Sequence, residues 1–484
     1  MKRAYLCLLS MLTGCAMEPP PPPDIAAPTQ YTRAPLAEQT TTADTRAGHA
    51  QTLASGKDIP AEWWKLFQSP ALDELVRMAL EQSPTLAQAR AKLTQAQENL
   101  SATRGGTQIP KVDAQAAANR IDVGAAPLPV ASPFDLYLAT VNVSYTLDLF
   151  GASRRELEAL QAQVDFQRYE FEAARLTLAG NVVTAAIREA SLREQLASIE
   201  TSVAVEARQV VITERLEELG TAAHADVVAQ RLELARIRAL LPELRSQLEQ
   251  VRNRLAVYTG QTPADARLPE FRLIDLQLPA ELPLSLPSEL TRQRPDIRAA
   301  EALLQQAGAR VGVATANMFP RITLSANLGS LAADSGDLFT SGSDFSFLLG
   351  SLTQPIFHGG ELRARRRAAI AAYEQAGAAY LQAVLQGFQN VADVLQALHA
   401  DAEILAQRAE AETMARRYYD ITSARYQAGG VSQYFLLDAQ RKLLDTSRER
   451  TQAAANRHAD SAALLQALGG GWWQGTRKQE GDAR

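Results

Sequence analysis

The sequence predicts a mostly α-helical chain that also carries four amphipathic β-strands and is built from one module present twice. Three observations predict this fold class. Residues that favour long helices (Ala, Leu, Gln, Glu and Arg) are abundant, while aromatic residues make up only 6% of the 484 residues. Two proline-free runs, 152–219 and 361–428, are each long enough for a helix of roughly 100 Å. Similar short sequences recur at an offset close to 210.

The N-terminal residues have the order of a processing signal. Lys2 and Arg3 precede an apolar run, 4–12, that is too short to cross a bilayer as a helix. Leu-Thr-Gly-Cys then ends at Cys15 and resembles a bacterial lipobox. We expect a lipoprotein signal peptide at 1–14 and, on Cys15, a covalent N-acyl and S-diacylglycerol lipid. No other cofactor is expected. The alternative is an ordinary signal peptide with a chance cysteine.

The residue after Cys15 and the proline run that follows also fit a lipid-anchored N-terminus. Ala16 stands in the position that, in bacterial lipoproteins, implies sorting to the outer membrane. Five consecutive prolines at 19–23 indicate an extended spacer. We therefore expect a lipid-anchored, extended N-terminal segment at 15–60.

Paired motifs set the borders of the duplication. Ser83-Pro84 resembles Arg294-Pro295, and the turn glycine Gly220 is matched with Gly430. The first repeat is expected at 61–260 and the second at 288–470. A Pro-rich linker at 261–287 joins them, and a C-terminal tail follows at 471–484.

Two strands are expected in each repeat, at about 110–120 and 136–149 and at about 320–329 and 344–357. The clearest is the stretch from Tyr137 to Leu149, where apolar and polar residues alternate. A period of two over about thirteen residues is long for a soluble strand and suits a tilted strand that crosses a membrane. The intervening loops are rich in Gly, Pro, Ser and Asp.

A long helical hairpin follows the strands in each repeat, at 152–258 and at 360–468. The return helix of the first hairpin has apolar residues spaced alternately by three and four from Val227 to Tyr258, with Gln230 among them. This heptad pattern is typical of helices that coil around a partner. Pro242 lies within it and predicts a kink or a break.

Composition excludes several function classes. The formal net charge is −5 with both signs interspersed, so we expect no nucleic-acid partner. Five scattered histidines and two cysteines, Cys7 and Cys15, give no metal-ligand pattern. No phosphate-binding loop or paired catalytic motif is present. We expect no catalytic residue, no metal and no enzymatic activity.

The number of strands predicts an assembly. Four strands cannot close a barrel that satisfies every backbone hydrogen bond in lipid, and a barrel requires about eight strands at least. Several copies must therefore contribute, and three would supply twelve strands. We expect a homotrimeric, 12-stranded outer-membrane β-barrel, four strands per chain, continuous with a long periplasmic α-helical barrel.

Several motifs in order resemble the TolC/OprM-like outer membrane factor family, in its NodT-like lipoprotein branch. Besides the lipobox and the duplication, they include Trp63-Trp64-Lys-Leu-Phe67, Gln354-Pro355-Ile356-Phe357 and Leu468-Gly-Gly-Gly-Trp472. The resemblance implies an exit duct of a tripartite efflux pump, passive and trimeric, in contact with outer-membrane lipid. Its implied partners are a periplasmic adaptor (membrane fusion) protein and an inner-membrane pump of the RND type.

The resemblance also implies a gate at the two helical turns, where an aspartate of the first turn is linked to a tyrosine of the second. Asp226 and Tyr426 stand in those positions. The alternative is that Asp226 only caps the return helix and Tyr426 only packs. Ser432 and Gln433 stand where related members often carry an aspartate, so a polar ring is expected there in place of a carboxylate ring.

Two rival functions remain at this point. A lipid-anchored periplasmic coiled-coil scaffold or adaptor without channel activity fits the long helices, but it does not need strands of period two. An envelope enzyme anchored by the same cysteine would need clustered catalytic residues in a compact domain.

Overall fold

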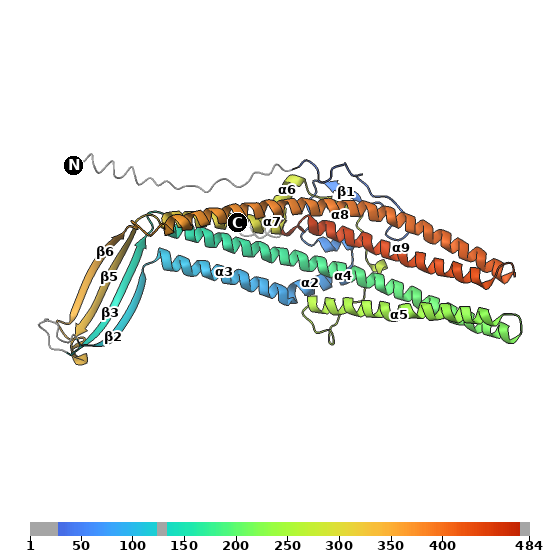
Figure 1. Cartoon of the computed structure of the whole chain (residues 1–484), viewed down its shortest axis with the longest axis horizontal. Coiled ribbons are helices and arrows are strands. Elements are labelled where there is room, and N and C mark those ends of the chain that lie inside the picture. Colours follow the sequence, from blue (N-terminus) through green and yellow to red (C-terminus); the bar gives the residue numbers. More distant parts are fainter. Residues whose placement is uncertain (1–27, 123–132, 475–484) are drawn as a thin grey trace. The chain divides into compact units, whose positions relative to one another are not determined.

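The computed structural model describes residues 28–122 and 133–474 (Figure 1). The expected signal peptide, Cys15 and the tail residues 475–484 lie outside the described residues. The chain divides into two compact units. Among the described residues, one is formed by Ala91–Arg168 and Ala299–Leu381, and the other by 28–90, Tyr169–Arg298 and 382–474. The following paragraphs treat each unit by itself.

The first unit contains one four-stranded antiparallel sheet (Figure 1). Its strands are β2 (Lys111–Ile121), β3 (Phe134–Leu147), β5 (Arg321–Ala332) and β6 (Asp344–Thr353), in the order β2-β3-β5-β6. β6 ends at Thr353 although the pattern predicted a strand to about 357, because Pro355 has no amide hydrogen for the ladder. β2 and β6 are the two edges, and neither has a further strand beside it within the described residues.

The register gives this sheet two chemically different faces. On one face, Val143 lies opposite Val112 and Ala326, and Tyr145 lies opposite Leu324. On the other, Ser144 lies opposite both Lys111 and Ser325. We call these the apolar face and the polar face. The alternation predicted for β3 therefore extends across neighbouring strands.

Helices enter and leave the sheet at one end. α3 (Pro84–Gln108) leads into β2 and α7 (Pro295–Ala316) into β5, while α4 (Ala152–Glu218) follows β3 and α8 (Glu361–Gln427) follows β6. Asp148 fixes the start of α4, because its carboxylate oxygens accept the backbone N–H groups of Ser153 and Arg154 at 3.1 and 2.9 Å. α3 and α4 pack through a small cluster centred on Leu100 and Val164.

The second unit contains the distal parts of two helical hairpins. α5 (His224–Tyr258) returns from α4, and α9 (Gln433–Ala467) returns from α8. The buried side chains of α5 follow the predicted heptad pattern closely; they are Val227, Gln230, Leu234, Ile237, Leu244, Leu248, Val251, Leu255 and Ala256. α5 continues through Pro242, so the break considered there does not occur.

The two hairpins have identical element lengths, which fixes the repeat offset. α4 and α8 each have 67 residues, and α5 and α9 each have 35. Each element of the second hairpin starts 209 residues after its counterpart. Sequence motifs had suggested an offset close to 210, and this difference of one residue changes which turn residues correspond.

The segment predicted as a linker is folded into the second unit. It contains η2 (Leu273–Asp275) and β4 (Glu281–Leu284), and its side chains Phe271, Leu273, Leu276 and Leu282 are buried. β4 pairs in parallel with β1 (Thr52–Ser55) of the N-terminal segment. The prolines that suggested a free linker alternate with apolar residues, and those residues supply the core contacts.

A buried arginine holds the N-terminal segment on this core. Arg457 is 1% exposed and donates to the backbone oxygens of Ala47 and His49 at 2.6 and 3.3 Å. It also donates to the side chains of Thr40 and Gln51. Because a buried guanidinium needs several acceptors, these contacts fix residues 40–51 of the segment that the sequence predicted as extended.

The rest of the core of the second unit contains residues from the start of the first repeat, the start of the second repeat and the C-terminal residues 468–473. η1 (Trp63–Phe67) buries Trp63, Trp64 and Phe67 beside α2 (Pro70–Gln82) and α6 (Pro287–Gln293). Gly471 lies against the same core, where an added Cβ would stand 2.3 Å from the carbonyl oxygen of Ile59. Among the described residues, no helix has the length and apolar character needed to cross a membrane.

Candidate functional site at the helical turns

Both hairpins turn through the same backbone motif. In the first, the N–H of Gly220 donates to the Glu217 carbonyl and the N–H of Thr221 to the Leu216 carbonyl. In the second, Gly429 and Gly430 donate in the same way to Tyr426 and Arg425. Each motif is a Schellman cap, which requires a left-handed residue after the helix.

The left-handed residue is Gly220 in the first turn and Gly429 in the second, with φ of 75° and 73°. Gly430 lies in the second turn as expected, but it is the residue after the cap and does not have a positive φ. The structural counterpart of Gly220 is therefore Gly429, in agreement with the 209-residue offset.

Asp226 occupies the third position of α5. Its carboxylate accepts the backbone N–H of Ala223 at 3.2 Å, which satisfies one of the unpaired amides at the start of the helix. Asp226 is half-buried, and its negative charge also favours a helix N-terminus.

Tyr426 lies in the last turn of α8 and is half-buried. Burial raises the pKa of its hydroxyl, and the negative charge of Asp226 raises this pKa further. The two side chains are thus close enough to interact electrostatically across the hairpins. Among the described residues, the Asp226 carboxylate accepts its hydrogen bond from the Ala223 N–H and not from Tyr426.

Ser432 and Gln433 begin α9 and have different environments. Ser432 is exposed and precedes the first residue of the helix. Gln433 is buried, and its side-chain amide donates to the Gln230 side-chain oxygen on α5. Of these two residues, only Gln433 therefore links the two hairpins within one chain.

This contact belongs to a buried polar chain that the sequence did not predict. Gln230 in turn donates to Oε1 of Glu206 on α4, and Gln440 of α9 donates to Oε2 of Glu206 at 2.9 Å. Glu206 and Gln230 are both 0% exposed. We call Glu206, Gln230, Gln433 and Gln440 the hairpin lock.

Burial raises the pKa of Glu206 to about 7, although the hydrogen bond from Gln440 opposes this rise. The negative charge of Glu233 contributes a smaller increase. A glutamine at a heptad position, Gln230, was the one sequence feature that pointed to such a cluster. Its acidic partner lies on α4, which showed no comparable pattern.

Asp438 does not belong to this cluster. It accepts from Arg441 and Lys442 at 2.8 and 2.7 Å, which makes it a local ion-pair acceptor of α9. No group of three or more metal-ligating side chains is placed to hold an ion among the described residues. Cys15, the expected lipidation site, lies outside them.

Comparison with known proteins identifies the family. The family model for outer membrane efflux proteins matches residues 75–261 and 286–470. OpmQ of Pseudomonas aeruginosa, a pyoverdine export outer membrane protein, is 32% identical over 489 residues, which cover 98% of this chain and 97% of OpmQ.

Solved structures of outer-membrane channels are also similar to this chain. The outer-membrane channel OprN superposes with a TM-score of 0.82 at 28% identity, covering 93% of this chain and 99% of OprN. The MtrE outer membrane channel of Neisseria gonorrhoeae, in its open state, superposes with a TM-score of 0.78 at 26% identity, covering 93% of this chain and 98% of MtrE.

These findings confirm the predicted fold class: a mostly α-helical, duplicated subunit of a homotrimeric channel in which a β-barrel of the outer membrane continues into a helical barrel. They also favour the exit duct over the coiled-coil scaffold. The chain belongs to the outer membrane efflux protein family and serves as the outer-membrane exit duct of an efflux pump.

Proposed function

We propose that this duct works passively, with a periplasmic adaptor (membrane fusion) protein and an inner-membrane transporter of the RND type, and opens at its helical turns. It catalyses no reaction in this proposal. Support comes from the family, whose members are transport channels. In each hairpin, a tight turn also joins a helix of 67 residues to one of 35 residues.

The single observation that carries the conducting role is the sheet. In the membrane-spanning part of β2, β3 and β5, the face of Val143 is mainly apolar and the face of Ser144 mainly polar, whereas the edge strand β6 adds Phe347 and Leu349 to the polar face. Both edges lack a partner strand within the described residues. An amphipathic sheet with open edges is stable in lipid only when copies close it into a barrel. The polar face then lines a water-filled interior.

The hairpin lock and the Asp226–Tyr426 pair support a gate at the turns. The hairpin lock connects the two hairpins by hydrogen bonds that water can replace. Asp226 and Tyr426 interact across the hairpins through the negative charge of Asp226, which raises the pKa of the Tyr426 hydroxyl. A polar contact of this kind contributes about 0.5–3 kcal/mol to the closed state. Three copies in a trimer give a closed state that adaptor contacts could outweigh.

We further propose that Cys15 carries N-acyl and S-diacylglycerol chains that anchor the N-terminus in the outer membrane. The support is the order of the basic residues, the apolar run and the lipobox, followed by Ala16. Several acyl chains hold a protein firmly to a membrane, whereas one holds it only marginally.

Conductance measurements on the purified trimer in planar bilayers test the gate. We expect Asp226→Ala and Tyr426→Phe each to raise the closed-state leak, because each removes one side of the link between the hairpins. Tyr434→Phe is the matched control, since Tyr434 lies in the first turn of α9 but is 70% exposed.

Two results would contradict the proposal in different ways. Equal leak in all variants and the unaltered protein would remove the gate assignment to Asp226 and Tyr426. The absence of any channel from correctly assembled trimers would contradict passive conduction itself.

A further inference from the structure

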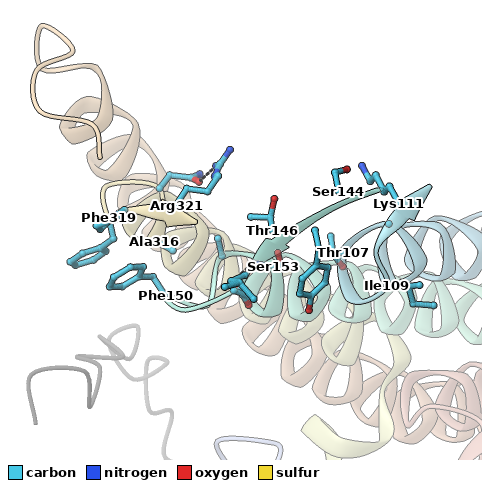
Figure 2. Close-up of a pocket in the computed structure, with 17 residues that line it drawn as sticks. Thr107, Ile109, Lys111, Ser144, Thr146, Phe150, Ser153, Ala316, Phe319 and Arg321 are labelled. Carbon is cyan, nitrogen blue, oxygen red and sulfur yellow. Dashed lines mark hydrogen bonds between the residues drawn. The ribbon is translucent and has the colours of Figure 1, made fainter. Parts of the chain in front are cut away.

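The four connections between strands and helices lie at one end of the sheet, within one unit. Figure 2 shows this region, which includes the ends of α3 and α7, the start of β2 and β5, and the passage from β3 into α4. Since the strands cross the membrane, their ends mark the level of the lipid headgroups in the leaflet on the helical side.

Large apolar side chains are exposed at each of these connections. Phe150 and Phe319 stack with ring centroids 5.0 Å apart and an interplanar angle of 9°, and both are labelled in Figure 2. The passage from β6 to α8 exposes Ile356 and Phe357 at 93% and 85%. Aromatic and apolar residues at the ends of spanning strands are typical of a membrane interface.

Positive charge is concentrated in the same connections. The segments 104–110, 148–158, 310–320 and 354–367 contain eight basic and four acidic residues, a net charge of +4 in a chain whose total is −5. α8 alone carries four arginines in its first seven residues, and α4 has Arg154 and Arg155 in its first turn.

These arginines stand where the helix dipole disfavours them. The N-terminus of a helix carries partial positive charge, so cations in the first turns lower helix stability unless an anion compensates. Within the chain, Arg365 is paired with Glu361 at 2.5 Å and Arg154 with Asp148 at 3.5 Å. Both arginine side chains are nevertheless 71% exposed. The surplus of basic over acidic residues points to an anion from outside the chain.

We propose that the junction collar, formed by Phe150, Phe319, Ile356, Phe357 and the arginines Arg154, Arg363, Arg365 and Arg367, binds anionic glycerophospholipids of the leaflet on the helical side. The collar's apolar side chains contact the first acyl carbons, and the arginine side chains reach the phosphates. A phosphate group is a suitable partner because a guanidinium can bind two of its oxygens at once.

The polar face of the sheet supplies a built-in control. Lys111 lies opposite Ser144, and Arg321 shares the face of Ser325, so both cations belong to the face that lines the channel. Figure 2 labels both residues in the same region. Replacing them removes nearby positive charge without removing the collar's arginines.

The test compares three forms of the full-length trimer in detergent with added phosphatidylglycerol or phosphatidylcholine. Bound lipid is counted by native mass spectrometry, and the trimer's thermal midpoint is recorded in parallel. We expect the unaltered trimer to prefer phosphatidylglycerol. Arg363→Gln/Arg365→Gln/Arg367→Gln should bind it about 100-fold more weakly, and Lys111→Gln/Arg321→Gln should bind it normally. Raising the salt from about 0.15 to 1 M should reduce the preference, because the Debye length falls from about 8 to 3 Å.

Several outcomes overturn the inference. These are equal binding of both lipids by the unaltered trimer, equal loss in both variants, or the same midpoint increase with glycerol phosphate, which carries the phosphate without acyl chains. The inference depends on the outer-membrane placement of the strands. Channel conductance of the triple variant is therefore measured as well, because a conducting channel without lipid preference refutes the collar and leaves the proposed duct intact.

Discussion

Glu206 gives the sharpest prediction, because one buried carboxylate connects three helices. Its two oxygens accept amides from Gln230 on α5 and Gln440 on α9. Burial raises its pKa from 4.5 to about 7. The folded protein therefore holds a proton on Glu206 more tightly than the unfolded chain does.

The sign of the pH dependence follows from this pKa. A carboxyl group with a raised pKa contributes its full stabilisation below the unfolded value, and this contribution is lost as pH rises through about 7. A rise of this size corresponds to ~3 kcal/mol per chain, and water that enters between the hairpins lowers the amount by screening the charge. We expect the hairpin lock to weaken as pH rises from about 4.5 to about 7, with little further change above pH 8.

Hydrogen exchange measures this opening locally. After correction for intrinsic exchange rates, the first turns of α5 and α9 should exchange about tenfold faster at pH 8 than at pH 6, because only about one unit of the pKa difference falls in this interval. Glu206→Gln should abolish the difference, because its amide can accept from Gln230 and donate to Gln440 once the Gln440 amide rotates. Glu233→Gln should move the midpoint to lower pH, since the Glu233 charge raises the pKa of Glu206.

The hydrogen exchange of Glu206→Gln decides whether Glu206 controls the opening. If Glu206→Gln keeps the pH dependence of the unaltered protein, another group controls the opening and the assignment to Glu206 is wrong. Protection elsewhere in α5, around Leu248, serves as an internal reference because that part of the seam contains no titrating partner in the hairpin lock.

Three further predictions follow from the turns, the core and the N-terminus. Gly429→Ala should lower the trimer's thermal midpoint more than Gly430→Ala, since only Gly429 has a positive φ, where alanine costs ~1 kcal/mol; equal effects would contradict the cap assignment. Gly471→Ala should destabilise the unit around Trp63 by more than ~2 kcal/mol in chemical unfolding, because the new Cβ would stand 2.3 Å from the Ile59 oxygen. Cys15→Ser should remove the lipid detected by intact-mass analysis and leave the trimer band on gels unchanged; loss of the trimer would show that the anchor has a role in assembly.

The regular elements could be predicted from the sequence because their patterns are local. The alternation in β3 and the heptad of α5 both repeat within a few residues, and the structure reproduces them. The sequence analysis matched Gly220 with Gly430, whereas the structural counterpart of Gly220 is Gly429, one residue earlier. Two adjacent glycines look equivalent in a sequence, and only the hydrogen bonds of the cap distinguish them.

Features that depend on distant partners could not be predicted in the same way. β1 and β4 are separated by more than two hundred residues, and each is a four-residue strand without a clear period. Arg457 looks like an ordinary helical arginine until the N-terminal segment folds over it. Glu206 likewise has no distinguishing neighbour in the sequence, because its partners come from two other helices.

The composition of the seam between the hairpins explains why the turns are the natural place to open. From Leu234 to Leu255, the buried positions of α5 are apolar, and each buried leucine or valine contributes about 1.5–3 kcal/mol. Nearer the turn Val227 is still buried, but Gln230 and Gln433 take two of the buried positions, and each of their hydrogen bonds contributes only about 0.5–1.5 kcal/mol net. When the helices move apart, water can form hydrogen bonds with the glutamine amides. It cannot offset the free-energy cost of exposing a leucine side chain. The two glutamines therefore weaken the seam beside the turns, and it can part there while the apolar remainder keeps the helices paired.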